Sequence, residues 1–587
     1  MFMNVRKKDI MNALGQGGYI SQRILAEQTG NSLGIVNQSL KELMAEGYIH
    51  ADNTLTEKGH QLLADNRPRN AMILAAGYGI RMVPINTETP KGLLTVYGER
   101  LIERLIRQLH EAGVQEIYVV VGFMKEQYEY LIDRYGVKLV ANPEYATKNN
   151  LHSLKLLESS IERTYVMPCD IWCAENPFRN SELYSWYMVT DQIKENSSVR
   201  VNRKMEIVPT KKGMPGNHMV GIAYLCDDAA KRVRDNLRIM SQDAAYDEAF
   251  WEDTLHDEKW MAAARVVSAA KVVEINTYEQ LRNLDDQSDQ LKTDAIHVIC
   301  KALSVKAKDI VDITVLKKGM TNRSFLFCCK GKKYIMRIPG EGTGELINRA
   351  QEAQVYQKIN NVHICDDIAY MNPANGYKIT EYLNDARVCD PESLEDLSRC
   401  MKKLREFHNR KLQVDHTFDI FERIDFYQSL WGAAPSSYAD YQTTKDHVLS
   451  LRSYIDAHKE DYVLTHIDAV PDNFLFTKDD ADVRLIDWEY AGMQDPHVDI
   501  AMFCIYALYE KPQVDRLIDL YFDEGCTDEV RIKIYCYIAA CGLLWSNWCE
   551  YKRNLGVEFG EYSLRQYRYA KDYFRIVQDE LKRKGME

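Results

Sequence analysis

The sequence predicts a multidomain protein of mixed α/β and α+β class. The chain has 587 residues, more than a single hydrophobic core normally serves, so two to four domains are expected. Apolar strands alternate with amphipathic helices through the middle of the chain, which indicates a mostly parallel sheet with helices on both faces. From about residue 291 a few strands give way to helix-rich sequence. That change predicts a small mixed lobe followed by a larger helical lobe.

Composition narrows the class of protein. Hydrophobic residues make up 46% and charged residues 27% of the chain, as in folded globular proteins. The net charge of −12 argues against a general coating of nucleic acid. The cysteines show no CxxC spacing and the N-terminus has no apolar signal core, so we expect reduced thiols in a cytoplasmic protein. Residues 534–548 are too short for a membrane span and predict a buried helix.

The first segment, residues 1–68, has the pattern of a small helical DNA-binding unit. Ser32 can cap a helix. Apolar residues at helical spacing follow it, namely Val36, Leu40 and Leu43. The segment resembles the winged helix-turn-helix of MarR-like regulators. That resemblance implies that three polar side chains face a DNA major groove, namely Asn37, Gln38 and Lys41. Because the segment is nearly neutral, a protein contact or a homodimer interface is the alternative.

The second segment, residues 69–290, follows a polar, proline-containing linker. Buried strands are predicted at 71–75, 117–121, 137–141 and 165–167, with an amphipathic helix at 101–110. The first strand runs into a glycine turn whose backbone can approach phosphates closely, formed by Ala75, Ala76, Gly77 and Gly79. Arg81 and Lys91 follow and would neutralise a triphosphate. Together these residues resemble the sugar-phosphate and phosphocholine nucleotidyltransferases, which implies a Rossmann-like α/β domain. Ile80 departs from the Ser or Thr usual in that family.

Two carboxylates in this segment are candidates for a magnesium site. Asp170 follows a strand, and ligands of open α/β sheets bind at the carboxyl ends of strands. The resemblance implies that Asp253 is the second carboxylate and that CTP is the nucleotide. Asp253 has acidic neighbours, so a solvated surface is the alternative role. The resemblance also implies a substrate-binding loop with Asn142, Tyr145 and Asn150.

The third segment, residues 291–587, contains the most specific pattern of the chain. His466, Asp468 and Asn473 form an H-x-D-x-x-x-x-N loop, and Asp487 follows a second apolar run. Phosphoryl transfer needs a carboxylate that orients the attacking hydroxyl, assigned to Asp468. It also needs an amide and a carboxylate that hold Mg²⁺ on the phosphates of ATP, assigned to Asn473 and Asp487. The pattern predicts a two-lobed protein-kinase-like domain.

The start of this segment supplies the expected nucleotide contacts. Thr321 and Asn322 precede the first strand, where a phosphate-binding loop belongs. Arg337 stands where protein kinases carry a lysine, and Glu352 in the next helix can pair with it. The strands and helices of this segment are expected at 324–329, 333–338, 346–359, 379–383 and 474–476. The sequence around Arg337, Glu352 and Asp487 resembles the bacterial choline kinases.

That resemblance implies choline as substrate. A quaternary ammonium donates no hydrogen bonds, so aromatic faces and a carboxylate must hold it. Trp545 and Trp548 lie three apart on one side of a helix, and Glu489 and Tyr490 follow the catalytic loop. Two indoles filling a core are the alternative.

The two enzymatic segments predict one route. The kinase would convert choline and ATP into phosphocholine, and the transferase would join phosphocholine to CTP, giving CDP-choline and pyrophosphate. One alternative is a kinase for ethanolamine, another amino alcohol or an aminoglycoside, fused to a sugar-phosphate nucleotidyltransferase. The other is a metabolite-sensing, DNA-binding regulator with degenerate enzyme domains.

Overall fold

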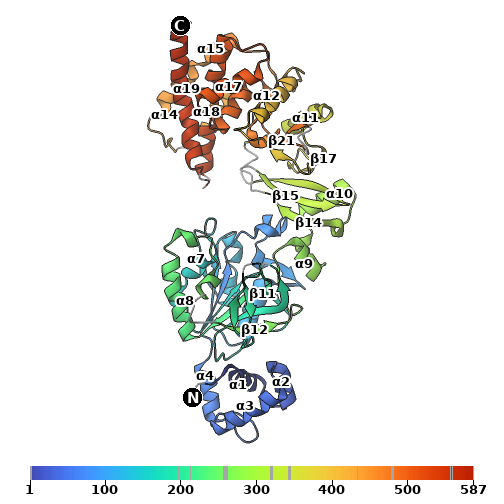
Figure 1. Ribbon diagram of the computed structural model, residues 1–587, viewed down its shortest axis with the longest axis vertical. Coiled ribbons are helices and arrows are strands. Elements are labelled where there is room, and N and C mark those ends of the chain that lie inside the picture. The colour runs from blue at the N-terminus through green and yellow to red at the C-terminus, as the bar shows by residue number, and fades with distance from the viewer. Residues whose placement is uncertain are drawn as a thin grey trace. The chain divides into compact units, whose positions relative to one another are not determined.

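The computed structural model describes residues 3–195, 197–211, 213–255, 262–316, 322–340, 346–432, 434–477, 482–554, 557 and 559–585. The chain forms two compact units: Met1–His297 with Ile313–Val315, and Val298–Asp312 with Leu316–Glu587 (Figure 1). The first unit contains the helical and the α/β segments, and the second contains most of the kinase-like segment.

The N-terminal helices fold as the sequence predicts. They are α1 (Val5–Gly17), α2 (Gln22–Thr29), α3 (Leu33–Ala45) and α4 (Glu57–Asp65). The side chain of Ser32 accepts a hydrogen bond from the Ile35 nitrogen and caps α3, as expected. The apolar face of α3 is buried. A bridge between Ile49 and Leu55 closes the short hairpin of the wing. These features confirm the winged helix.

The α/β segment is built on a seven-stranded sheet in the order β12-β8-β11-β6-β1-β4-β5. The strands are β1 (Asn70–Ala75), β4 (Glu116–Val121), β5 (Lys138–Ala141), β6 (Thr164–Pro168), β8 (Trp186–Lys194), β11 (Gly216–Leu225) and β12 (Ala263–Val267). Strands β6, β1, β4 and β5 are parallel, and β11 runs antiparallel to β6 and β8. Three separate two-stranded sheets accompany this sheet: β2 (Thr95–Val96) with β3 (Glu99–Arg100), β7 (Ile171–Cys173) with β13 (Val272–Glu274), and β9 (Val199–Val201) with β10 (Ile207–Pro209).

Both faces of this sheet are covered by helices, as predicted. Alternate side chains of β1 point to opposite faces. Ile73 packs in a core with residues of α5 (Leu101–Glu111). Met72 packs in a second core with residues of α7 (Asn150–Lys155) and α8 (Asp227–Met240). The remaining helices are α6 (Leu131–Tyr135) and α9 (Tyr278–Leu284). Because β1 and β6 are parallel neighbours, their carboxyl ends lead to the same edge.

The kinase-like segment has the two expected lobes. The small lobe contains a five-stranded sheet in the order β14-β15-β16-β18-β17. Its elements are α10 (Asp294–Leu303), β14 (Ile310–Val315), β15 (Asn322–Cys329), β16 (Lys332–Pro339), α11 (Arg349–Ile359), β17 (Ile368–Met371) and β18 (Lys378–Glu381). Helix α11 begins three residues later than predicted, because the Asn348 side chain accepts hydrogen bonds from the nitrogens of Ala350 and Gln351 and caps it there.

The large lobe is helical around one short three-stranded sheet and one strand pair. Its helices are α12 (Leu394–His408), α13 (Ile420–Ser429), α14 (Tyr441–Ser450), α15 (Arg452–His458), α16 (Val498–Tyr506), α17 (Lys511–Tyr521), α18 (Asp528–Asn554) and α19 (Glu561–Lys584). Its strands are β19 (Arg387–Val388), β20 (Val463–Thr465), β21 (Phe474–Phe476), β22 (Val483–Leu485) and β23 (Gly492–Gln494). Strand β22 ends before Asp487, because that residue has a φ of 66° and cannot continue a strand.

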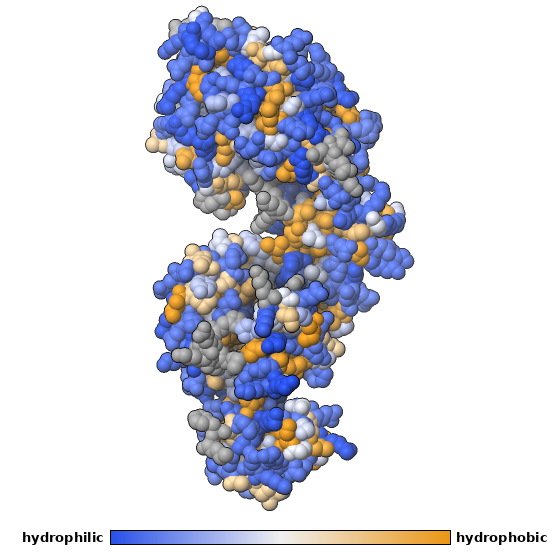
Figure 2. All heavy atoms as spheres, viewed as in Figure 1, coloured by the Kyte–Doolittle hydropathy of each residue, from blue (hydrophilic) through white to orange (hydrophobic). Residues whose placement is uncertain are grey.

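Helix α18 contains the predicted buried helix, and most of its residues are buried. Among the described residues, no helix is long and apolar enough to cross a membrane. On the face drawn in Figure 2, hydrophilic residues predominate and apolar ones lie among them.

Candidate functional sites

The glycine turn of the α/β segment lies directly after β1. Gly79 has a φ of 60°, and a Cβ there would lie 2.8 Å from the Cγ of Lys91. A Cβ on Gly77 would meet open space. Ala75 and Ala76 lead from β1 into the turn. The turn therefore packs on Lys91 at Gly79 and stays open at Gly77, where a phosphate could approach the backbone.

Lys91 and Arg81 meet at one asparagine that the sequence did not suggest, and Lys91 also pairs with Asp170. The Lys91 ammonium donates to Asp170 Oδ2 and to Asn276 Oδ1, both at 2.7 Å. Arg81 donates to the same Asn276 oxygen at 2.8 Å. Asn276 follows β13, which pairs with β7 directly after Asp170. The strand-like segment V-V-E-I, which leads to Asn276, was the available signal.

The donor set around Asp170 fits a cation. Its Oδ1 is buried and has no hydrogen-bond partner among the described residues. A buried carboxylate oxygen without a donor is an oxygen ligand of the kind that Mg²⁺ takes. The described part of the chain has no group of three or more His, Cys, Asp or Glu placed to hold a metal. A magnesium ion here would therefore take further ligands from nucleotide phosphates and water.

The predicted substrate loop is largely engaged in internal contacts. Buried Asn142 donates to Ser153 Oγ at 3.0 Å and accepts from the Glu144 nitrogen at 2.9 Å. Asn150 accepts from the Trp251 nitrogen at 2.7 Å and so holds the short helix Trp251–Leu255. The Tyr145 ring lies 5.1 Å from the ring of Tyr78, in the glycine turn. Of these three residues, Tyr145 contacts the turn.

Asp253 lies on that short helix. Its Oδ2 accepts from the Phe250 nitrogen at 3.1 Å, and its role as a metal ligand stays a prediction. The neighbouring Glu252 accepts a hydrogen bond from the Tyr187 hydroxyl at 3.1 Å. Burial raises the pKa of Glu252 to about 7.

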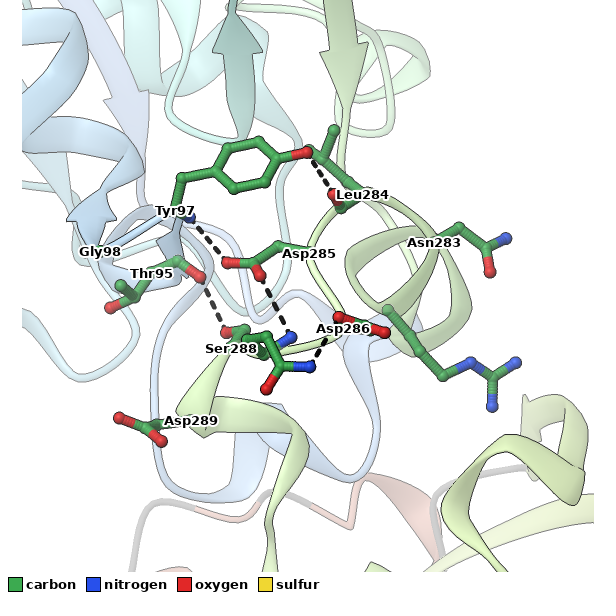
Figure 3. A pocket seen from close by; sticks show the side chains of 11 residues that line it. Thr95, Tyr97, Gly98, Asn283, Leu284, Asp285, Asp286, Ser288 and Asp289 are labelled. Atoms are coloured by element: carbon green, nitrogen blue, oxygen red, sulfur yellow. Dashed lines mark hydrogen bonds between the residues drawn. The ribbon is translucent and has the colours of Figure 1, made fainter.

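A separate pocket of about 710 Å³ lies between the β2–β3 hairpin and the end of α9 (Figure 3). Its polar groups bond to one another. The Tyr97 nitrogen donates to Asp285 at 2.7 Å, and Ser288 donates to the Thr95 carbonyl at 2.8 Å. No predicted site residue lines it. These contacts tie the hairpin to the chain after α9.

The kinase-like unit has a cavity of about 480 Å³ that gathers most of the predicted residues. Nine of them line it: Asn322, Arg337, Asp468, Asn473, Asp487, Glu489, Tyr490, Trp545 and Trp548. Thr321 lies outside the described residues. Further residues that line the cavity, and that the sequence did not suggest, are Lys378, Asp366, Asp472, Tyr506 and Tyr562. Asp472 lies inside the H-x-D-x-x-x-x-N loop, directly before Asn473, whereas the other four come from distant parts of the chain and share no motif.

The predicted catalytic loop is fixed by two sets of hydrogen bonds. The Asn473 amide donates to the backbone oxygen of Asp468 at 2.9 Å and to its Oδ2 at 3.2 Å. Asp499 accepts from the backbone nitrogens of His466 and Ile467 at 3.0 and 2.7 Å. The nitrogen of Asn473 is thus engaged, and its amide oxygen is the atom suited to a metal.

Burial dominates the electrostatics of this loop. Burial, followed by the charges of Asp487 and Glu489, holds the pKa of Asp468 well above its usual value. Burial and Glu489 raise the pKa of Asp487 to about 7. Two carboxyls with raised pKa values in one cavity favour the binding of a cation there. Burial also lowers the pKa of His466 to about 4, so this ring is neutral near pH 7.

The expected Arg337–Glu352 pair is present. The guanidinium donates to both carboxylate oxygens, at 2.5 and 2.8 Å, and a third bond reaches the Gly376 carbonyl at 3.1 Å. Burial alone would raise the pKa of Glu352, but Lys378, Arg337 and Arg349 lower it to about 2. Arg337 and Lys378 therefore present two cations to the cavity.

Glu489 lines the cavity, but its carboxylate already has partners. Its Oε2 accepts from Asn322 and from Arg349, both at 2.9 Å. The adjacent Tyr490 begins an aromatic surface. Its ring lies 5.5 Å from that of Trp545, which lies 5.5 Å from that of Trp548.

The polar residues of the winged helix lie as expected on its surface. Asn37, Gln38 and Lys41 are exposed on α3. Gln38 donates to Glu42 at 3.0 Å.

Three family models match the chain. They are Choline/ethanolamine kinase at residues 313–519, the MobA-like NTP transferase domain at 71–180, and Winged helix-turn-helix DNA-binding at 3–50. They confirm the three types of domain and their order.

The chain is also similar to curated proteins. It is 44% identical to the choline-phosphate cytidylyltransferase of Streptococcus pneumoniae over 20% of this chain and 51% of that protein, about half its length. It is 32% identical to the 2-aminoethylphosphonate cytidylyltransferase of Lancefieldella rimae over 37% of this chain and 92% of that protein. It is 29% identical to Protein LicA of Haemophilus influenzae over 42% of this chain and 76% of that protein. Among solved structures, the choline kinase LicA from Streptococcus pneumoniae aligns at 27% identity with a TM-score of 0.43, covering 48% of this chain and 98% of that one.

Proposed function

The chain belongs, through its α/β segment, to the nucleotidyltransferase family that includes these cytidylyltransferases, and from that membership we propose a two-step function. The kinase segment phosphorylates choline with ATP. The α/β segment then joins phosphocholine to CTP, which gives CDP-choline and pyrophosphate. The observation that carries the proposal is the aromatic surface in the same cavity as Asp468.

The kinase cavity offers what phosphoryl transfer requires. Asp468 orients the hydroxyl of the amino alcohol, and its raised pKa helps it to accept the proton. Asn473 and Asp487 would hold Mg²⁺, which neutralises the charge on the phosphates of ATP. Arg337 and Lys378 add two cations on the phosphate side.

The substrate end favours a quaternary over a primary ammonium. A primary ammonium needs hydrogen-bond acceptors, whereas a trimethylammonium needs aromatic faces. Tyr490, Trp545 and Trp548 supply the faces. Glu489 Oε2 is already bound by Asn322 and Arg349, which lowers its value as an acceptor for ethanolamine. These contacts support choline as the substrate.

The α/β segment offers the parts of a nucleotidyl transfer. The glycine turn, Arg81 and Lys91 would bind the triphosphate of CTP. Mg²⁺ on Asp170, together with Asp253, would stabilise the charge that develops as a phosphate oxygen attacks the α-phosphorus and pyrophosphate leaves.

A phosphonate is the second candidate substrate, because the similarity to the 2-aminoethylphosphonate enzyme covers nearly all of that protein. The kinase segment argues for phosphocholine. Phosphoryl transfer to a hydroxyl makes a C–O–P bond, so the kinase product is a phosphate ester. A phosphonate has a C–P bond and cannot be that product.

The test is a coupled assay on the full chain with choline, ATP, CTP and magnesium, with CDP-choline followed by mass spectrometry. Ethanolamine replaces choline in one arm, and each of the other three nucleoside triphosphates replaces CTP in a second. In a third arm, added 2-aminoethylphosphonate is compared with added phosphocholine as the substrate for CTP. Asp468→Ala should abolish phosphocholine formation and leave cytidylyl transfer from added phosphocholine. Lack of CDP-choline from the folded wild-type protein would refute the proposal.

We also propose that the winged helix binds DNA through α3, since Asn37, Gln38 and Lys41 are exposed there. The measurement is binding of the full chain to DNA upstream of its own gene at several salt concentrations. Absence of salt-sensitive binding, together with a concentration-dependent dimer, would favour the dimerisation role.

A further inference from the structure

Glu489 is the meeting point of the two lobes of the kinase unit. Its Oε2 accepts from Asn322 of β15 and from Arg349 of α11, both at 2.9 Å. Arg337 Nη1 of β16 lies 3.5 Å from the same oxygen. All three cationic or amide groups belong to the small lobe, whereas Glu489 follows the catalytic loop of the large lobe. One carboxylate oxygen of Glu489 thus connects the two lobes.

Arg349 joins two carboxylates with one nitrogen. Its Nη1 donates to Glu352 and to Glu489, both at 2.9 Å, and its Nη2 donates to Asn322 at 3.2 Å. The side chains of Arg349, Glu352 and Glu489 are 9%, 0% and 2% exposed. A buried charge without its partner is costly, so these contacts constrain one another strongly. Arg349 itself is not one of the described residues that line the cavity.

The network reaches both ligands. On one side, Glu352 holds Arg337, which lines the cavity where the phosphates of ATP would bind. On the other side, Glu489 is followed directly in the sequence by Tyr490, whose ring centre lies 5.5 Å from that of Trp545. A shift of Glu489 would therefore move both an arginine of the nucleotide side and a ring of the amine side.

We propose that Arg349 is a positioning residue that couples nucleotide binding to amino-alcohol binding through Glu489. The inference rests on the proposed kinase function. When phosphates draw Arg337 toward them, Arg349 and Asn322 retain Glu489 and keep Tyr490 in place for the amine. A first ligand that orders this network removes part of the ordering cost for the second, which makes the coupling positive.

The substitutions separate charge from geometry. Arg349→Lys keeps the charge but loses the planar fork that serves two carboxylates and an amide. Arg349→Gln removes the charge as well. Glu489→Gln tests the other end. The matched control is Arg387→Gln, because Arg387 also makes a two-bond pair with a carboxylate of the same unit, Asp396, and does not line the cavity.

The experiment measures the dissociation constant of choline, by calorimetry on the full chain, without and with saturating Mg–ADP. Ethanolamine serves as a second probe. We expect Mg–ADP to tighten choline binding about fivefold or more in the wild type and in Arg387→Gln, within the usual range of couplings. The ratio should fall to about one in Arg349→Gln and Glu489→Gln, and to an intermediate value in Arg349→Lys. Choline should change the affinity for Mg–ADP by the same factor.

Two outcomes would overturn the coupling role. The first is a wild-type ratio of one for an amine that the enzyme phosphorylates. The second is a wild-type ratio that persists in Arg349→Gln while both affinities drop, since a merely structural role predicts that pattern. If Arg349→Gln does not fold, Arg349→Lys and Glu489→Gln decide the matter. Failure of the wild type to bind or phosphorylate either amine contradicts the proposed substrate class instead, and with it the coupling.

Discussion

Replacing Trp548 by leucine tests whether the aromatic surface binds the cation. Trp548 lines the cavity, and the Lys552 ammonium lies 5.8 Å from its ring centre, so this indole already accepts one cation. Leucine keeps an apolar side chain but removes the π face. A desolvated cation over a tryptophan face contributes about 1–2 kcal/mol. At 1.36 kcal/mol per tenfold change, we expect the KM for choline to rise about 5- to 30-fold, with the KM for ATP unchanged.

The assay compares choline with 3,3-dimethylbutan-1-ol, which has the same shape without the charge. The preference for choline over this neutral alcohol should shrink in Trp548→Leu. The control is Trp431→Leu, which removes a buried indole that bonds to the Asn547 carbonyl and does not line the cavity. An unchanged KM for choline in folded Trp548→Leu, or an equal loss for both alcohols, would refute the cation-binding role and favour core packing.

Three further predictions concern separate parts of the chain. Gly79→Ala should lower cytidylyl transfer at least tenfold and leave the kinase activity unchanged, because a Cβ would lie 2.8 Å from Lys91 Cγ at a φ of 60°. Wild-type cytidylyl transfer in this variant would contradict the role of the turn. His466 has its pKa lowered by burial from 6.5 to about 4, so its contribution to stability is present above pH 6.5 and is lost as the pH falls toward 4. That loss is on the order of 3 kcal/mol. In His466→Gln, the free energy of unfolding measured in urea should therefore depend less on pH between 6.5 and 4, and an unchanged pH dependence would refute the assignment. Lys41→Gln should reduce the slope of log K against log salt by about one if Lys41 contacts a phosphate, and an unchanged slope would place Lys41 away from DNA.

The sequence determined the domain types because each carries a local signal. The helical spacing of Val36, Leu40 and Leu43, the glycine turn after 71–75, and the H-x-D-x-x-x-x-N loop all depend on residues close in the chain. Local rules of propensity, capping and loop chemistry act at that range. The candidate catalytic residue Asp468 and the candidate metal ligands Asn473 and Asp487 could therefore be named from the sequence, and they line one cavity.

Only the tertiary structure decided which distant residues share a site. Asn276 reaches Lys91 across 185 positions of sequence, and Glu489 reaches Asn322 across 167. No local pattern records such contacts, because strand pairing and lobe packing create them. The same packing pairs Glu489 with Arg349 and places the rings of Tyr490, Trp545 and Trp548 together in the cavity, where we propose that the substrate binds. The sequence thus identified the chemistry, whereas burial and long-range charge pairing decided which groups remain available to perform it.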